Sequence, residues 1–133
     1  MEFEFLSIGK KGEILKIVQY SPTGIPNIYN LGFGDKNLKT GKISDSVTSD
    51  NGDSQKVLAT VAGTAIKFMQ LHPASQIIVV GSSKSRTRLY QIGISNNLVE
   101  ISKTFNVYGF STGKWTKFDK GNNYNAFLIR KKK

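Results

Sequence analysis

The sequence predicts a single α+β domain: a mixed, mostly antiparallel sheet with one long helix and one or two short helices. Three observations lead to this fold class. Segments with alternating apolar residues occur towards both ends of the chain, a middle segment has apolar residues at helical spacing, and a short β-branched run follows that segment. The length of 133 residues suits one hydrophobic core, so residues 1–133 are expected to form one domain.

The first third of the chain predicts antiparallel strands. We expect strands from Phe3 to Ser7 and from Glu13 to Tyr20, joined by a glycine-containing turn at residues 9–12. A third strand should run from Asn27 to Phe33, with Ile28 facing away from its apolar neighbours Tyr29, Leu31 and Phe33. A further strand is expected from Lys42 to Thr48.

The middle of the chain predicts a helix followed by a buried strand. Asp53 or Ser54 can cap a helix that runs to about Leu71 and carries these apolar residues on one face: Leu58, Val61, Ala62, Ala65 and Met69. The run from Gln76 to Val80 is typical of a strand covered on both faces. Together these elements require a parallel pairing with a right-handed crossover.

The rest of the chain predicts a short helix and closing strands. A basic helix should run from Lys84 to Ile92 and be closed by Gly93. One or two further helical turns are expected around Leu98, Ile101 and Phe105, followed by antiparallel strands over residues 106–111, 114–119 and 124–131. Residues 130–133 are expected to form a basic tail, either ordered or disordered.

The charge is unevenly distributed along the chain. Residues 1–66 carry seven basic and seven acidic side chains, whereas residues 67–133 carry twelve basic and two acidic ones, which accounts for the net charge of +10. Such a field attracts polyanions, either nucleic acid or an acidic protein.

Composition excludes several kinds of chemistry. Without cysteine there is no disulfide, thiolate nucleophile or cysteine zinc site, and the single histidine, His72, excludes a histidine-pair metal site, so no metal is expected. His72 precedes Pro73, where a helix should end, and we interpret it as structural. No apolar run is long enough to span a membrane, and the predicted location is the cytoplasm.

Two clusters are candidate ligand sites. Ser83, Lys84, Arg86 and Arg88 place a helix start, a hydroxyl group and three cations together, which suits a phosphate. The alternative is a solvated helix face with Arg86 in a structural ion pair. The second cluster, Lys114, Trp115 and Lys117, combines cations with an aromatic ring, as single-stranded nucleic-acid binders do. Its alternative is an ordinary edge strand protected by lysines, with Phe110 and Phe118 in the core.

Two resemblances extend these predictions. The phrases at residues 30–36, 51–54 and 85–90 resemble an uncharacterised bacterial family of small basic proteins, and the similarity covers nearly the whole chain. The segment from Ser85 to Ile94 looks like the last core helix of the GNAT acyltransferases. That resemblance implies an acyltransferase-like fold, acetyl-CoA or another acyl-CoA as cofactor, and Tyr90 as general acid.

The acyltransferase resemblance also identifies a cofactor cradle. Gly52 and Ser54 would stand where that superfamily holds the coenzyme pyrophosphate, but the second glycine is missing, and Asp50 and Asp53 would repel an anion. The sequence therefore favours a non-catalytic binding domain that engages nucleic acid or an acidic protein, without a cofactor. The alternative is a divergent acyl-CoA-dependent transferase.

Overall fold

The computed structural model describes residues 1–44, 52–81 and 83–132. In chain order the elements of these residues are β1 (Glu2–Gly9), β2 (Gly12–Pro22), β3 (Ile28–Asp35), α1 (Ser54–Leu71), β4 (Gln76–Val79), α2 (Lys84–Asn96), α3 (Leu98–Ser102), β5 (Phe105–Ser111), β6 (Lys114–Lys117) and β7 (Ala126–Lys131). The predicted α+β class is confirmed. None of the helices in these ranges is long and apolar enough to cross a membrane.

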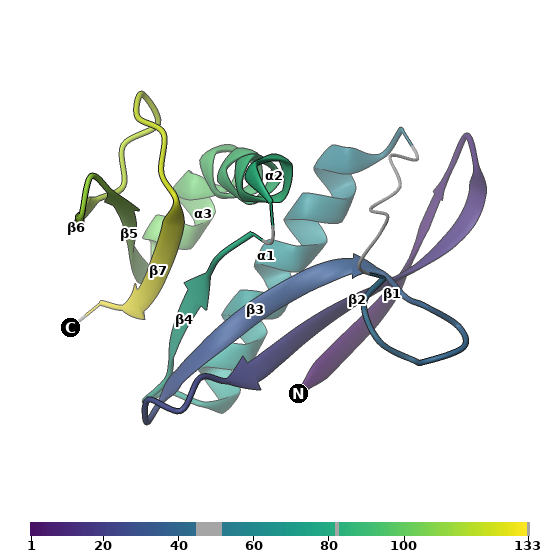
Figure 1. Cartoon of the computed structure of the whole chain (residues 1–133), viewed down its shortest axis with the longest axis horizontal. Coiled ribbons are helices and arrows are strands. Elements are labelled where there is room, and N and C mark those ends of the chain that lie inside the picture. Colours follow the sequence, from purple (N-terminus) through teal and green to yellow (C-terminus); the bar gives the residue numbers. More distant parts are fainter. Residues whose placement is uncertain (45–51, 82, 133) are drawn as a thin grey trace.

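The described strands form a seven-stranded sheet in the order β1-β2-β3-β4-β7-β5-β6. The β3–β4 pair is parallel, and the other pairs are antiparallel. As expected, the parallel pair is connected through a helix, α1. β7, the last strand in the chain, lies between β4 and β5 and joins the two parts of the sheet (Figure 1).

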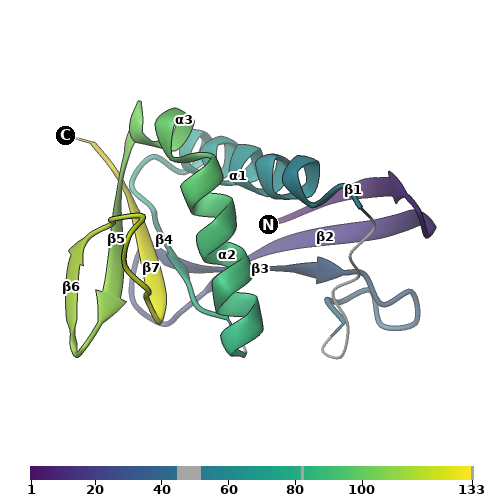
Figure 2. The same ribbon diagram turned by 90° about the horizontal axis from the view of Figure 1, so that it is seen from above.

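The helices lie on one face of the sheet. Figure 2 shows α1 running along the side of β2 and β3, with α2 crosswise to it and α3 at its far end. The strands present alternate residues to α1 and α2, so Val18, Leu31, Ile77 and Phe127 are all buried. On this covered face Tyr20 stacks on Phe68 of α1, with ring centroids 4.4 Å apart.

None of the described helices lies on the opposite face of the sheet over β4, β7, β5 and β6 (Figures 1 and 2). The prediction that the strand at Gln76–Val80 is covered on both faces is therefore wrong. Ile77 and Val79 are buried under the helices, but Ile78 is half-buried and Val80 is 47% exposed. The β-branched run persists because Ile78 still packs among neighbouring strands, opposite Asn30 and Leu128.

Two predicted helix ends have other roles. Gly93 does not close α2, which continues to Asn96. Instead Gly93 lets α2 approach α1, because an added Cβ would lie 3.1 Å from Leu58 Cδ2. Asp53 precedes α1, but its side chain makes no cap; its two carboxylate oxygens accept hydrogen bonds from Ser7 Oγ, each at 2.8 Å. A partner 46 residues away thus replaces the local cap.

Two further strand predictions concern the last strand and the segment after β3. Arg130 and Lys131 belong to β7, as the strand prediction has it: they pair with Asn106 and Phe105 in the sheet, and Lys132 N–H donates to Thr104 O at 3.0 Å. Backbone pairing here outweighs the charge run. Most of the strand expected from Lys42 to Thr48 lies outside the described residues; its described part contains an isolated bridge between Lys36 and Ile43.

Candidate functional site

The described ion pairs use cations mainly from the first half of the chain. Lys16, which is 1% exposed, pairs with Asp35, and Lys36 pairs with Glu4. The third described pair, Lys103–Glu100, lies on the surface beside α3. Most cations of residues 67–132 therefore face solvent without a described acidic partner, and they are the ones available to a ligand.

The predicted cluster on α2 divides into two parts. Ser83 is the N-cap of α2, and its hydroxyl accepts the Arg86 backbone N–H at 3.2 Å, which gives it a structural role. Arg86 is half-buried, and its Nη2 donates to Ser44 O at 3.0 Å. Within residues 1–44, 52–81 and 83–132 the partner of this guanidinium is a backbone carbonyl rather than a carboxylate. Lys84 and Arg88, one helical turn apart, remain exposed on another side of α2.

Lys84 and Arg88 line a groove between α2 and the loop at residues 119–125. We call it the α2 groove. Its volume is about 540 Å³, and its lining contains a third cation, Lys120, but no carboxylate. The remaining lining consists of hydroxyl, amide and ring side chains with one exposed isoleucine: Thr87, Gln91, Ile92, Ser95, Asn96, Asn123, Tyr124 and Asn125. Such a groove can donate many hydrogen bonds to an anion.

Hydrogen bonds between α2 and the 119–125 loop fix the far wall of the groove. Gln91 Nε2 donates to Asn122 O at 2.6 Å, and Gln91 Oε1 accepts the Tyr124 backbone N–H at 3.2 Å. Tyr124 Oη in turn accepts the Asp119 N–H at 2.9 Å. The loop that carries Lys120 is therefore held against α2 before any ligand arrives.

The second predicted cluster lies on β6, at the edge of the sheet. Its register places Trp115 opposite Phe110 and Lys117 opposite Tyr108, on the face without helices, and Lys114 on the other side. Trp115 is 42% exposed, and its ring lies 5.1 Å from that of Phe110. Phe118 is buried as expected, but Phe110 is half-buried and belongs to the uncovered face rather than to the core.

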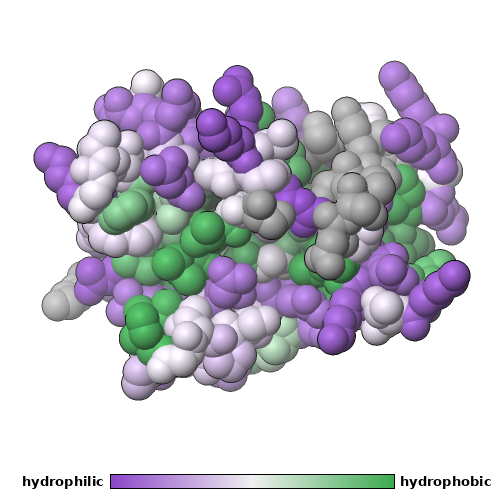
Figure 3. Space-filling model, viewed as in Figure 1, coloured by the Kyte–Doolittle hydropathy of each residue, from purple (hydrophilic) through white to green (hydrophobic). Residues whose placement is uncertain are grey.

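We define the open sheet face as the uncovered residues Tyr108, Phe110, Trp115, Lys117, Leu128 and Arg130. The Arg130 guanidinium lies 5.9 Å from the centre of the Tyr108 ring. Beside them is a recess of about 510 Å³ lined by Asn106, Tyr108, Arg130, Lys131 and Lys132. Figure 3, viewed as in Figure 1, shows a group of hydrophobic side chains left of the centre with hydrophilic ones around it.

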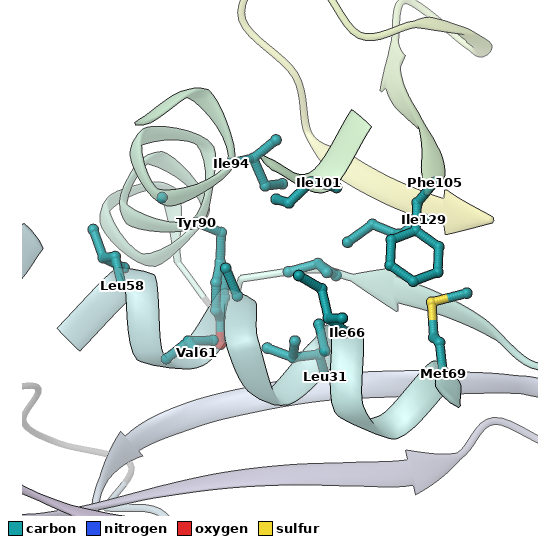
Figure 4. A pocket seen from close by; sticks show the side chains of 14 residues that line it. Leu31, Leu58, Val61, Ile66, Met69, Tyr90, Ile94, Ile101, Phe105 and Ile129 are labelled. Atoms are coloured by element: carbon teal, nitrogen blue, oxygen red, sulfur yellow. The ribbon is translucent and has the colours of Figure 1, made fainter. Parts of the chain in front are cut away.

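Tyr90 lies inside the molecule, where β3 and β4 part. The β3–β4 pairing ends at Leu31 and Val79, and beyond it the Phe33 N–H donates to Tyr90 Oη at 3.1 Å. In Figure 4 the side chain extends from α2 towards α1 and lines an apolar cavity of about 40 Å³. Burial raises the pKa of Tyr90, although the Phe33 hydrogen bond and the charge of Arg86 lower it in part.

The segment expected to hold a pyrophosphate contains a fixed carboxylate. Gly52 has a φ of 80°, and Asp53 is fixed by Ser7 at the start of α1. The side chain of Ser54, together with residues 50 and 51, lies outside the described part. The residues that are described do not fit a pyrophosphate, because the Asp53 carboxylate would repel it.

Sequence reasoning missed Lys120, Gln91 and Arg130. The turn-forming run at Gly121, Asn122 and Asn123 indicates a loop, but no local pattern indicates that Gln91 holds this loop against α2. For Arg130, the alternation of the last strand contained a usable signal, since it places Leu128 and Arg130 on one face.

Comparison with protein-family models identifies the family of the chain. The model of a family of unknown function (DUF6934) matches residues 1–132. The resemblance to an uncharacterised family is therefore confirmed. No curated protein and no solved structure matches the chain, so its likeness to acyltransferases stays a prediction.

Proposed function

We propose that this chain, which belongs to the DUF6934 family of unknown function, is a non-catalytic domain whose α2 groove binds the phosphates of a nucleic acid. The observation that carries the proposal is the meeting of Lys84, Arg88 and Lys120 in one groove without a carboxylate. Arginine and lysine beside hydroxyl and amide groups are the usual contacts of phosphate oxygens.

The amides of the groove suit a nucleic acid, because they can bond to more than its phosphates. Carboxylates and phosphates only accept hydrogen bonds, whereas Asn96, Asn123 and Asn125 offer acceptors as well as donors. Bases and sugars carry donors that can use these acceptors. The surrounding excess of positive charge adds attraction at long range, which depends on salt.

The test is binding of a fluorescently labelled 20-nucleotide single strand, followed by anisotropy across a salt series. Replacing Lys84, Arg88 and Lys120 together by alanine should weaken binding roughly tenfold or more. It should also reduce the slope of log affinity against log salt by roughly 2, because three phosphate contacts are lost.

A charge-matched control separates the groove from the general field. Lys84→Glu with Arg88→Glu changes the net charge as much as Lys39→Glu with Lys67→Glu, and the latter two residues are exposed and do not line the groove. Equal losses in the two double variants would overturn the groove as the site. If polyglutamate binds as tightly as the labelled strand, the ligand of the groove is an acidic protein instead of a nucleic acid.

A divergent acyl-CoA-dependent transferase is the second candidate function, favoured by the position of Tyr90. Its hydroxyl stands at the parting of the two parallel strands, where it accepts the Phe33 N–H, and burial raises its pKa, which makes it a weaker acid than an exposed tyrosine. The poor fit of Asp53 to a pyrophosphate argues against acetyl-CoA, so we assign no catalytic step to this cofactor.

Thermal unfolding with acetyl-CoA tests the second candidate. A ligand at a hundred times its dissociation constant adds about 2.7 kcal/mol, which raises the melting temperature by several degrees. An increase that persists in high salt, and that ATP does not reproduce, would support the transferase. Turnover that Tyr90→Phe abolishes without weakening cofactor binding would assign the acid. An unchanged melting temperature with acetyl-CoA would reject the transferase as the function.

A further inference from the structure

The open sheet face combines aromatic rings and cations on residues that alternate with core residues. In β5, Val107 and Gly109 face the helices, whereas Tyr108 and Phe110 face away from them. The neighbouring strands add Trp115 and Lys117 from β6, and Leu128 and Arg130 from β7. The arrangement is therefore set by the register of three strands.

The protection of an edge strand explains only part of this pattern. Lysines on β6 would prevent pairing with another sheet, and Lys114 and Lys117 suit that role. A tryptophan that is 42% exposed on the same edge strand does not, because it adds apolar surface where association has to be avoided. The Phe110–Trp115 pair, with ring centroids 5.1 Å apart, presents that surface beside the lysines.

The charges around these rings indicate a ligand with both flat groups and phosphates. Arg130, Lys131 and Lys132 line the adjoining recess with Asn106 and Tyr108, and no acid contributes to its lining. Alternation of rings and cations matches a polynucleotide, whose bases stack on rings while its backbone meets cations. In a duplex the bases are already stacked on one another, so an unpaired strand fits this face better.

We propose that the open sheet face binds single-stranded nucleic acid, with a base stacked on Trp115 and phosphates on Lys117 and Arg130. This inference rests on the proposed function and adds to it the class of nucleic acid. It predicts that single strands bind more tightly than duplexes of the same charge. It also assigns the two surfaces different tasks: the α2 groove holds phosphates through its three cations, and the open sheet face adds the stacking of a base.

The chain contains a single tryptophan, so its intrinsic fluorescence reports on this face directly. Unlabelled oligo(dT) and oligo(U) should each quench Trp115, because a stacked base lies against the indole. Polyphosphate of equal charge has no bases and should bind without comparable quenching. Quenching by polyglutamate equal to that by the oligonucleotides would overturn the proposal in favour of an acidic protein.

Substitutions measured by anisotropy with the labelled single strand give a second readout. Trp115→Ala should weaken binding roughly tenfold, and Trp115→Phe should retain part of the affinity, since a ring remains for stacking. Val99→Ala, at a residue of α3 that is 77% exposed, is the matched apolar control and should leave affinity unchanged. A melting temperature is recorded for each variant to confirm folding.

The outcomes distinguish this inference from the proposed function. One possible result is that anisotropy detects binding, that Trp115 fluorescence is not quenched, and that Trp115→Ala leaves the affinity unchanged. This result would overturn binding at the open sheet face and keep the α2 groove as the site. Quenching that persists in Lys84→Glu with Arg88→Glu, at unchanged affinity, would support the face and overturn the groove. If the labelled strand binds no more tightly than a duplex, the preference for single strands is wrong.

Discussion

The two faces of the sheet are made by alternate residues of the same strands, yet the aromatic rings on them differ in exposure to solvent. On the covered face Phe127 is completely buried, with Phe118 and Tyr124 rings 6.0 Å away. On the open face Phe110 and Trp115 contact each other but remain in reach of solvent, beside Lys117 and Arg130. The exposed cations that the register assigns to the covered side, Lys114 and Lys131, lie at the ends of β6 and β7.

This contrast separates rings that stabilise the fold from rings that are available to a ligand. Burial of a ring contributes to stability in proportion to the apolar area removed from water. A ring left half-exposed contributes less, and its retention beside cations is better explained by a binding role. Stability and binding should therefore respond to substitutions on opposite faces.

The largest expected effect is at the centre of the covered face. Phe127→Ala should lower the free energy of unfolding by about 3–5 kcal/mol, because it leaves a cavity between the sheet and the helices. Leu128→Ala, the next residue on the opposite face, should cost less than half as much. Urea unfolding measures both, and equal losses would show that the two faces do not differ as described.

A close contact on the covered face provides the second test. At Gly109 an added Cβ would lie 2.2 Å from Tyr124 Cδ1, so Gly109→Ala should cost about 1–3 kcal/mol through overpacking. Gly63→Ala is the control, since nothing lies within 4 Å of its added Cβ and the residue is inside α1. That control should raise the melting temperature, because alanine favours a helix.

Alkaline pH should weaken the covered face. Burial raises the pKa of both Tyr20 and Tyr90 above the usual value of 10.0. Below pH 10 the folded and unfolded chains both keep these protons, and stability is complete. Above pH 10 the unfolded chain ionises first, so the free energy of unfolding should fall by up to about 1.4 kcal/mol per pH unit for each tyrosine.

Urea unfolding at pH values from 8 to about 11 measures this loss. The matched variant is Tyr20→Phe with Tyr90→Phe, which should show a flatter pH profile even though it starts from lower stability. An unchanged slope in that variant would contradict the assignment of the loss to these two side chains.

The smallest effect on stability should be at the open face. Trp115→Ala removes a half-exposed ring and its contact with Phe110, so the free energy of unfolding should change by about 1 kcal/mol or less. The same substitution is expected to have the largest effect on single-strand binding. A large loss of stability instead would assign Trp115 to the fold.

Much of the fold is predictable because its signals are local. Alternation identifies β1, β2 and β3, and helical spacing identifies α1 with an end at Leu71. The same spacing places Lys84 and Arg88 together on α2. These signals depend only on a residue and its near neighbours in the chain.

The incorrect predictions concern contacts between distant segments. Gly93 has the local pattern of a helix C-cap, but in the structure it is the point where α2 packs against Leu58 of α1. Asp53 has the local pattern of an N-cap, but its carboxylate accepts a hydrogen bond from Ser7 of β1 at 2.8 Å. Lys120 joins the α2 groove only because Gln91 fixes the 119–125 loop. Such contacts are set by tertiary packing and leave no periodic pattern.

The position of β7 has a consequence for how the chain is made on the ribosome. Of the strands in the described sheet, Ala126–Lys131 is the last to emerge, yet β4 and β5 are joined through it. Until then β4 presents an unpaired edge that includes Ile77 and Val79, a surface on which nascent chains can aggregate. Folding of the complete sheet must therefore follow translation of residue 131, and a nascent chain stalled before β7 should depend on chaperones.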